Sequence, residues 1–115
     1  MVKIWHNQKC SKSRASLEVL ENSNEDFEIF NYLEDEVTTQ MIEDILKKLN
    51  ISARELMRVK EELYKELNVS NVADEKTLIE IMSKNPSLIE RPIIIKNDKA
   101  VIGRPLENTI ELLKV

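Results

Sequence analysis

"VKIWHNQKCSKSRASLEVLENSNEDFEIFNY" (residues 2–32) contains the pattern of elements from which the fold class is predicted. Its first residues, Val2-Lys-Ile-Trp5, are apolar at both ends, which predicts a short strand running into a loop. From Ser11 onward the apolar residues recur at roughly helical spacing, until Asn22-Ser-Asn24 breaks the pattern. Phe27 to Tyr32 alternates loosely and predicts a second strand. Strand, helix and strand within about thirty residues make a βαβ unit, which implies a parallel pair.

The middle of the chain has the capping signals of helices. The predicted N-caps are, in order, Thr38 or Thr39, Ser52 and Asp74. The strongest is Ser52-Ala-Arg-Glu55, which has the spacing of a capping box and opens a helix through Leu56 and Met57. The predicted stops are Asn50 for the first helix and Asn85-Pro86 for the last. Residues 61–67 fit either a continuation of the second helix or a separate turn.

The last third of the chain changes to a β pattern. Ile93-Ile-Ile95 is β-branched, Asn97-Asp98 is a turn signal, and Ala100-Val-Ile102 follows, which predicts a β-hairpin. Pro105 suits the first position of a closing helix. That helix would carry Leu106, Ile110 and Leu113 on its apolar side. The whole order is therefore β-α-β, a helical block over about 38–86, and β-β-α.

Composition limits the classes of protein that this chain can be. It has 115 residues, enough for one domain (1–115), with 42% hydrophobic and 33% charged residues. A net charge of −4 argues against non-specific binding to nucleic acid, which needs a basic surface. No stretch approaches the about 18 apolar residues of a membrane span. The apolar run of a signal peptide is not expected either, because Trp5 is followed at once by polar residues. We expect a cytoplasmic monomer that binds neither nucleic acid nor membrane. Gly103 is the only glycine, which excludes a glycine-rich phosphate loop.

Cys10 is the one residue whose surroundings suggest chemistry. It is the only cysteine, so no intramolecular disulfide can form. If the helix begins near Ser11, the thiol sits at its N-terminal end, where unpaired N–H groups and the helix dipole stabilise a thiolate. The basic residues nearby act in the same direction: His6, Lys9, Lys12 and Arg14. A lone cysteine is more often an inert small hydrophobe, so the residues alone leave both readings open.

Several separated motifs resemble the glutaredoxin-dependent arsenate reductases of the ArsC family. They are "WHNQKCSKSR", "NYLEDEVT", "LNISARELMR", "NPSLIERPIII" and "VIGRP", and together they span nearly the whole chain. Gln8 stands where the family commonly has a proline. The resemblance implies an α/β, thioredoxin-like β-α-β / β-β-α fold with a helical insertion between strands 2 and 3.

The resemblance also implies roles for individual residues. Cys10 would be the catalytic nucleophile. The arginines that hold the oxyanion would be Arg58, Arg91 and Arg104. His6 and Ser13 would tune and orient the thiolate, and Pro92 would be the cis-proline opposite the cysteine. Judged singly, each of these residues is more often an ordinary surface or structural residue.

The reaction that the resemblance implies is reduction of arsenate to arsenite. The Cys10 thiolate attacks arsenic, and an external thiol completes the reduction because the chain has no second cysteine. Glutathione would be the co-substrate and glutaredoxin the partner that clears the mixed disulfide. No metal and no tightly bound cofactor is expected.

Two other functions fit the same sequence features. One is an Spx-like regulator of the same superfamily, redox-responsive and binding RNA polymerase; Arg104 and the single cysteine favour the reductase over it. The other is a glutathione-dependent thiol oxidoreductase that does not act on arsenate.

Overall fold

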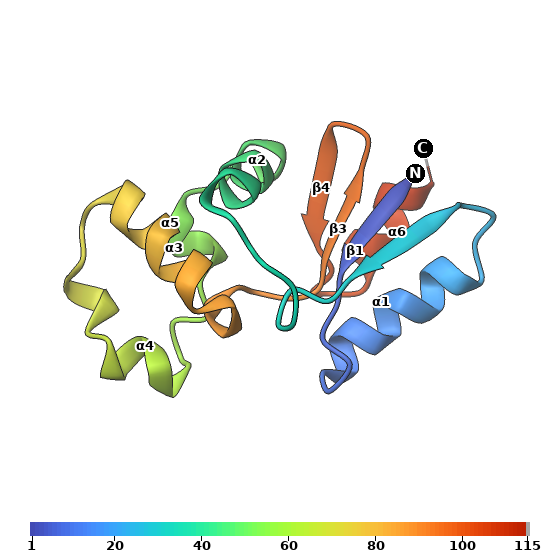
Figure 1. Ribbon diagram of the computed structural model, residues 1–115. Helices are drawn as coiled ribbons and strands as arrows, with labels where there is room; N and C mark the ends of the chain where they lie inside the picture. Colours follow the sequence, from blue (N-terminus) through green and yellow to red (C-terminus); the bar gives the residue numbers. More distant parts are fainter. Residues whose placement is uncertain (115) are drawn as a thin grey trace. The chain divides into compact units, whose positions relative to one another are not determined.

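The computed structural model describes residues 1–114 (Figure 1). Its elements are β1 (Val2–Trp5), α1 (Ser11–Glu21), β2 (Phe27–Phe30), α2 (Thr39–Leu49), α3 (Ala53–Leu56), α4 (Glu62–Glu66), η1 (Val69–Asn71), α5 (Glu75–Lys84), η2 (Pro86–Leu88), β3 (Ile93–Lys96), β4 (Lys99–Ile102) and α6 (Glu107–Leu113). The predicted order of β-α-β, helical block and β-β-α is confirmed. The chain divides into two compact units, one made of Met1–Asp35 with the chain from Arg91 onward, the other of Glu36–Glu90.

The first unit is built on one mixed sheet. Within residues 1–114 this sheet has four strands in the order β2-β1-β3-β4, which Figure 1 shows side by side. β1 and β2 are parallel, as the βαβ pattern predicts. β3 is antiparallel to β1, with Trp5 opposite Ile93, and β4 is antiparallel to β3, with Ile93 opposite Ile102. β1 therefore ends at the same edge of the sheet where β3 begins and β4 ends.

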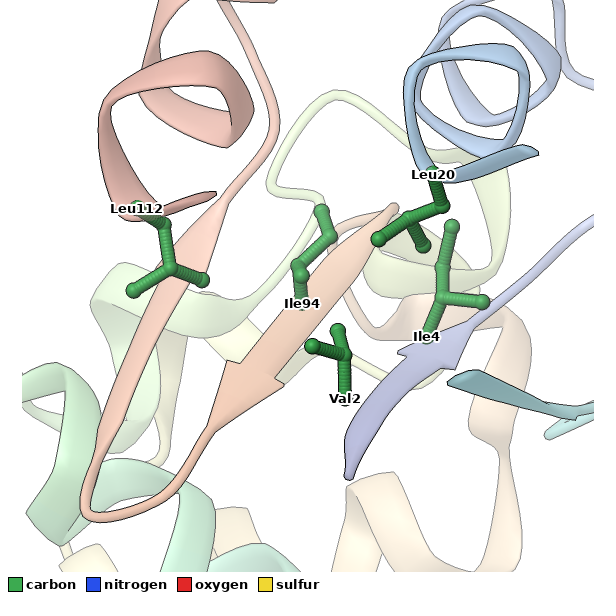
Figure 2. Packing of buried hydrophobic residues seen from close by; sticks show 5 residues of the cluster. All are labelled: Val2, Ile4, Leu20, Ile94 and Leu112. Carbon is green, nitrogen blue, oxygen red and sulfur yellow. The ribbon is translucent and has the colours of Figure 1, made fainter. Parts of the chain in front are cut away.

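The core of the first unit lies between the sheet and two helices. Figure 2 shows Val2 and Ile4 of β1 with Ile94 of β3, facing Leu20 of α1 and Leu112 of α6. All five side chains are buried. Because successive residues of a strand point to opposite faces, Trp5 lies on the other face of the sheet. There its ring contacts Phe30 and Tyr32, at centroid distances of 5.0 and 6.1 Å.

The second unit is made of short helices whose caps agree with the sequence. Thr38 caps α2 by accepting a hydrogen bond from the Met41 N–H at 3.2 Å. Ser52 and Glu55 form the predicted capping box, and Asp74 accepts from the Thr77 N–H at 3.1 Å. These caps satisfy backbone donors that a helix start leaves without a partner.

The boundaries of two predicted helices, the one after Ser52 and the closing one, differ from the structure. The helix after Ser52 ends at Leu56, because Met57 pairs with Ile89 in an isolated β-bridge. Residues 61–67, which fit either a continuation of that helix or a separate turn, hold a separate short helix, α4.

The closing helix begins at Glu107 instead of Pro105. Pro105 instead starts a tighter turn, in which its carbonyl accepts from the Asn108 N–H at 3.0 Å. The buried side of α6 consists of Thr109 and Leu112, so the expectation that Ile110 lies on the apolar side is wrong. Within residues 1–114, no helix has the length and apolar character to cross a bilayer.

Candidate active site

Cys10 lies where the loop after β1 turns into α1. It is the N-cap residue of α1, with extended backbone angles of φ −97° and ψ 121°. Its carbonyl accepts the first helical hydrogen bond, from the Arg14 N–H at 3.0 Å. Its side chain is partly exposed, so a small substrate can reach the sulfur. The predicted position at the helix N-terminus is confirmed.

The loop before Cys10 is held by its own hydrogen bonds. The Cys10 N–H donates to the Asn7 carbonyl, and the Lys9 N–H donates to the Asn7 side-chain oxygen, each at 3.0 Å. The Arg14 guanidinium donates to the Gln8 carbonyl at 2.8 Å. Sequence reasoning missed the part played by Asn7, although an Asn that bonds the backbone two residues on is a known turn signal.

Several groups act on the ionisation of the Cys10 thiol. Partial burial raises its pKa, because it disfavours the charged form. The backbone N–H groups of Ser13 and Lys12 act in the opposite direction, and so do the charge and side-chain hydrogen bond of Arg91. The stabilising groups prevail, so the pKa of Cys10 lies below its ordinary value. A larger share of the cysteine is therefore thiolate at neutral pH than in a free thiol.

His6 and Ser13 form a buried pair behind the cysteine. His6 Nδ1 lies 2.6 Å from Ser13 Oγ, and Ser13 Oγ also accepts from the Asn7 N–H at 3.0 Å. Both side chains are buried. Burial and the nearby Arg14 charge lower the pKa of His6, which Glu21 only partly offsets. The ring is therefore neutral at pH 7, and the pair fixes the first turn of α1 against the end of β1.

Arg91 comes to Cys10 through strand pairing. It lies two residues before β3, whose first residue is opposite Trp5 at the end of β1. The Arg91–Pro92 peptide bond is cis, the form expected of Pro92. The Pro92 carbonyl accepts from the Gly103 N–H at 2.8 Å, which joins this segment to the end of β4.

Arg104 lies at the same edge of the sheet, two residues after β4. It is exposed, and among residues 1–114 its side chain has no ion-pair partner. Its carbonyl accepts from the Asn108 side-chain amide at 3.5 Å. Arg104 therefore places a guanidinium that has no ion-pair partner within residues 1–114 at the edge of the sheet where β1 ends.

Arg58 belongs to the second unit. Its N–H donates to the Leu88 carbonyl at 2.8 Å, and its guanidinium lies 3.0 Å from a Glu61 oxygen and 3.9 Å from a Glu90 oxygen. The side chain is about three-quarters covered, with 24% exposed. Of the predicted site residues, the first unit thus holds together His6, Cys10, Ser13, Arg91, Pro92 and Arg104, and Arg58 has partners within its own unit.

The chemistry of this cluster is that of an activated thiol next to a cation. A thiolate is a strong nucleophile, and the planar guanidinium donors of arginine match the oxygens of a small oxyanion. Among residues 1–114 no group of three or more His, Cys, Asp or Glu side chains could hold a metal ion. The candidate site is therefore described by one sulfur and the basic groups around it.

Solved structures show the class to which this fold belongs. Arsenate reductase from Vibrio cholerae superimposes with a TM-score of 0.93 at 41% identity, covering 97% of each chain. The fold is the thioredoxin-like α/β fold of these structures, as the sequence motifs implied.

The family follows from the sequence comparisons. The model of the ArsC family matches residues 5–112, and the chain belongs to this family. It is 48% identical to uncharacterized protein YfgD of Escherichia coli K12, over 97% of this chain and 96% of that one. It is 46% identical to arsenate reductase of Neisseria meningitidis serogroup A, over 93% of each chain.

Proposed function

We propose that this protein is an arsenate reductase that uses an external thiol. The observation that carries the proposal is the partly exposed Cys10 at the N-terminus of α1, with a pKa lowered by backbone N–H groups and by Arg91. Family membership and the names of relatives such as the Neisseria meningitidis protein support arsenate as the substrate.

Each site residue has a distinct role in the proposed reaction. Cys10 is the nucleophile, and Arg91 and Arg104 bind the arsenate oxygens with bidentate, charge-assisted hydrogen bonds. Arg58 enters as a third oxyanion ligand on the strength of the resemblance alone. His6 and Ser13 orient the first turn of α1, and Pro92 sets the course of the chain beside the cysteine.

The first step forms a bond between sulfur and arsenic. The Cys10 thiolate attacks H₂AsO₄⁻, one arsenic–oxygen bond breaks, and the departing oxygen takes up protons and leaves as water. The product is a thiol–arsenate adduct in which arsenic is still As(V). Arginine groups stabilise the oxyanion charge during this attack because they are in place before it develops.

The second step transfers two electrons. A glutathione thiolate attacks the Cys10 sulfur, the sulfur–arsenic bond breaks, and its electron pair stays on arsenic, which leaves as As(OH)₃ after protonation. Cys10 and glutathione are left as a mixed disulfide, so two thiols have supplied the two electrons. Glutaredoxin then reduces that disulfide and frees Cys10. No metal or tightly bound cofactor enters these steps.

This chemistry also fits the setting that we expect. With one cysteine in the chain, release of the oxidised sulfur depends on glutathione and glutaredoxin from outside. Both are abundant where thiols are kept reduced, which favours the cytoplasm as the place where this protein works.

The test is a coupled assay in which arsenate-dependent NADPH consumption is followed with glutathione, glutaredoxin and glutathione reductase. We expect turnover by the natural chain and none by Cys10→Ser, with unchanged circular dichroism in the variant. Full activity of Cys10→Ser would refute the assignment of the nucleophile. If the natural chain shows no turnover but binds RNA polymerase tightly, the proposal is wrong and the regulator is the better description.

A further inference from the structure

A small cavity lies beside the loop that leads to Cys10, wholly within the first unit. Its volume is about 220 Å³. It is lined by His6, Asn7, Gln8, Lys9, Asn31, Leu33 and Glu34. These residues come from the loop after β1 and from the turn after β2, so the cavity lies on the β2 side of β1.

The cavity carries two opposite charges that the protein does not use. Lys9 and Glu34 are both exposed, and among residues 1–114 neither forms an ion pair. One charge stands on the loop before α1 and the other on the turn after β2. A ligand that carries both an ammonium and a carboxylate group would find a partner for each, in one orientation.

His6 adds a hydrogen-bond donor to the same cavity. Ser13 Oγ already accepts from the Asn7 N–H, so its own hydroxyl hydrogen is available for His6 Nδ1, 2.6 Å away. A neutral ring that accepts at Nδ1 carries its hydrogen on Nε2. No protein group within residues 1–114 is hydrogen-bonded to Nε2, which leaves its N–H for a carbonyl or carboxylate oxygen of a ligand.

We propose that this cavity is the docking subsite for the thiol donor, a tripeptide of the glutathione type; the inference rests on the proposed function. Glutathione has an ammonium and a carboxylate at its γ-glutamyl end, a second carboxylate at its glycine end, and its thiol between them. Glu34 binds the ammonium, Lys9 a carboxylate, and the His6 N–H an oxygen. Pockets for drug-sized ligands have about 300–1,000 Å³, so this smaller cavity takes one end of the tripeptide.

The position of the cavity suits a reaction with two substrates. The turn from Asn7 to Cys10 is closed by a 3.0 Å backbone hydrogen bond. A closed turn of this kind brings its end Cα atoms within about 7 Å, so a thiol in the middle of the bound tripeptide can reach the Cys10 sulfur. β2 and β3 flank β1 on opposite sides, and Arg91 precedes β3. The thiol donor therefore approaches from the side away from the arginine that binds the oxyanion.

Binding can be measured without any turnover. The probe is S-methylglutathione, titrated into Cys10→Ser protein by calorimetry, so that no disulfide can form. We expect saturable binding that weakens about three- to fivefold in Lys9→Gln and in Glu34→Gln, the size of one partly exposed ion pair. Matched controls are Lys99→Gln at the start of β4 and Glu18→Gln on α1, both exposed and outside the cavity, which should bind like the parent protein.

A kinetic arm separates this inference from the proposed function. In the arsenate assay, Lys9→Gln should raise the KM for glutathione and leave the KM for arsenate unchanged. Lys9→Gln should also bind free S-methylglutathione and one of its two monoethyl esters equally well. That ester is the glycine ester if Lys9 pairs with the glycine carboxylate, and the γ-glutamyl ester if Lys9 pairs with the γ-glutamyl carboxylate. Absence of saturable binding, or equal losses in the Lys99 and Glu18 controls, would overturn the subsite. Binding at the cavity without arsenate turnover would uphold the subsite and refute the arsenate substrate.

Discussion

Gly103→Ala is the substitution whose effect follows most directly from the structure. Gly103 lies between the end of β4 and Arg104, where α1 and α6 come close to the sheet. A Cβ atom added there would lie 2.6 Å from Ser16 Oγ, 2.6 Å from Thr109 Oγ1 and 2.9 Å from Ile94 Cδ1. Gly103 does not have a positive φ, so alanine suits the backbone and the whole cost comes from these contacts.

The magnitude follows from what the new methyl group displaces. Ser16 and Thr109 are both completely buried, and their hydroxyl oxygens are 2.8 Å apart in a hydrogen bond between α1 and α6. Overpacking of a well-packed core costs about 1–3 kcal/mol. Separation of the two hydroxyls leaves buried polar groups unsatisfied, which adds about 1–3 kcal/mol. We expect Gly103→Ala to lower the free energy of unfolding by about 2–6 kcal/mol, or to lower Tm by roughly 10–30 °C.

The assay is urea unfolding of four proteins: the natural chain, Gly103→Ala, Ser16→Ala/Thr109→Ala, and the triple variant. Without the two hydroxyl oxygens, the close contact that remains for the added methyl group is the terminal Cδ1 of Ile94, at 2.9 Å, so the substitution should cost much less. The coupling should therefore be most of the cost seen in the natural chain, about 2 kcal/mol or more. A cost below about 1 kcal/mol in the natural background, or an equal cost in both backgrounds, would refute the reasoning.

Three further predictions concern the site. Arg91→Ala removes a charge and a hydrogen bond that lower the pKa of Cys10. The alkylation rate of Cys10 should therefore rise at a higher pH than in the natural chain, and an unshifted pH profile would contradict that. Arg104→Ala should raise the KM for arsenate about tenfold or more, and leave the Cys10 alkylation profile unchanged, because Arg104 is not among the groups that lower its pKa. The folded pKa of His6 lies below 6.5, so the unfolded chain takes up its proton first as pH falls below about 6.5. The free energy of unfolding should therefore decline on acidification, and His6→Gln should show a smaller decline in urea titrations at a series of pH values.

Much of the fold could be predicted because its signals are local. The capping box at Ser52 and Glu55 and the cap at Asp74 were read directly, since a cap depends on residues three apart. The hairpin turn was read from Asn97, which has a positive φ of 56°. The position of Cys10 at the start of α1 was predicted for the same reason.

Other features depend on what each helix packs against. The buried side of α1 includes Ser13 and Ser16, which a hydrophobic pattern assigns to the surface. They are buried because Ser13 bonds His6 and Ser16 bonds Thr109, partners that lie outside the helix. Ile110 was expected inside and is exposed, because the sheet sets which side of α6 faces the core.

The order of elements, the helix caps and the thiol at a helix N-terminus could therefore be predicted without coordinates, since each of these arises from residues close together in the chain. Three-dimensional packing is what brings Arg91 to Cys10, what buries His6 against Ser13 and keeps it neutral, and what places Lys9 and Glu34 in one cavity beside the same loop. The approach of Arg91 to Cys10 and the shared cavity depend on β3 and β2 pairing with β1 on opposite sides, whereas the His6–Ser13 pair depends on how α1 packs against the end of β1. Strand pairing joins residues that are distant in the chain, and the local pattern of a sequence does not record it.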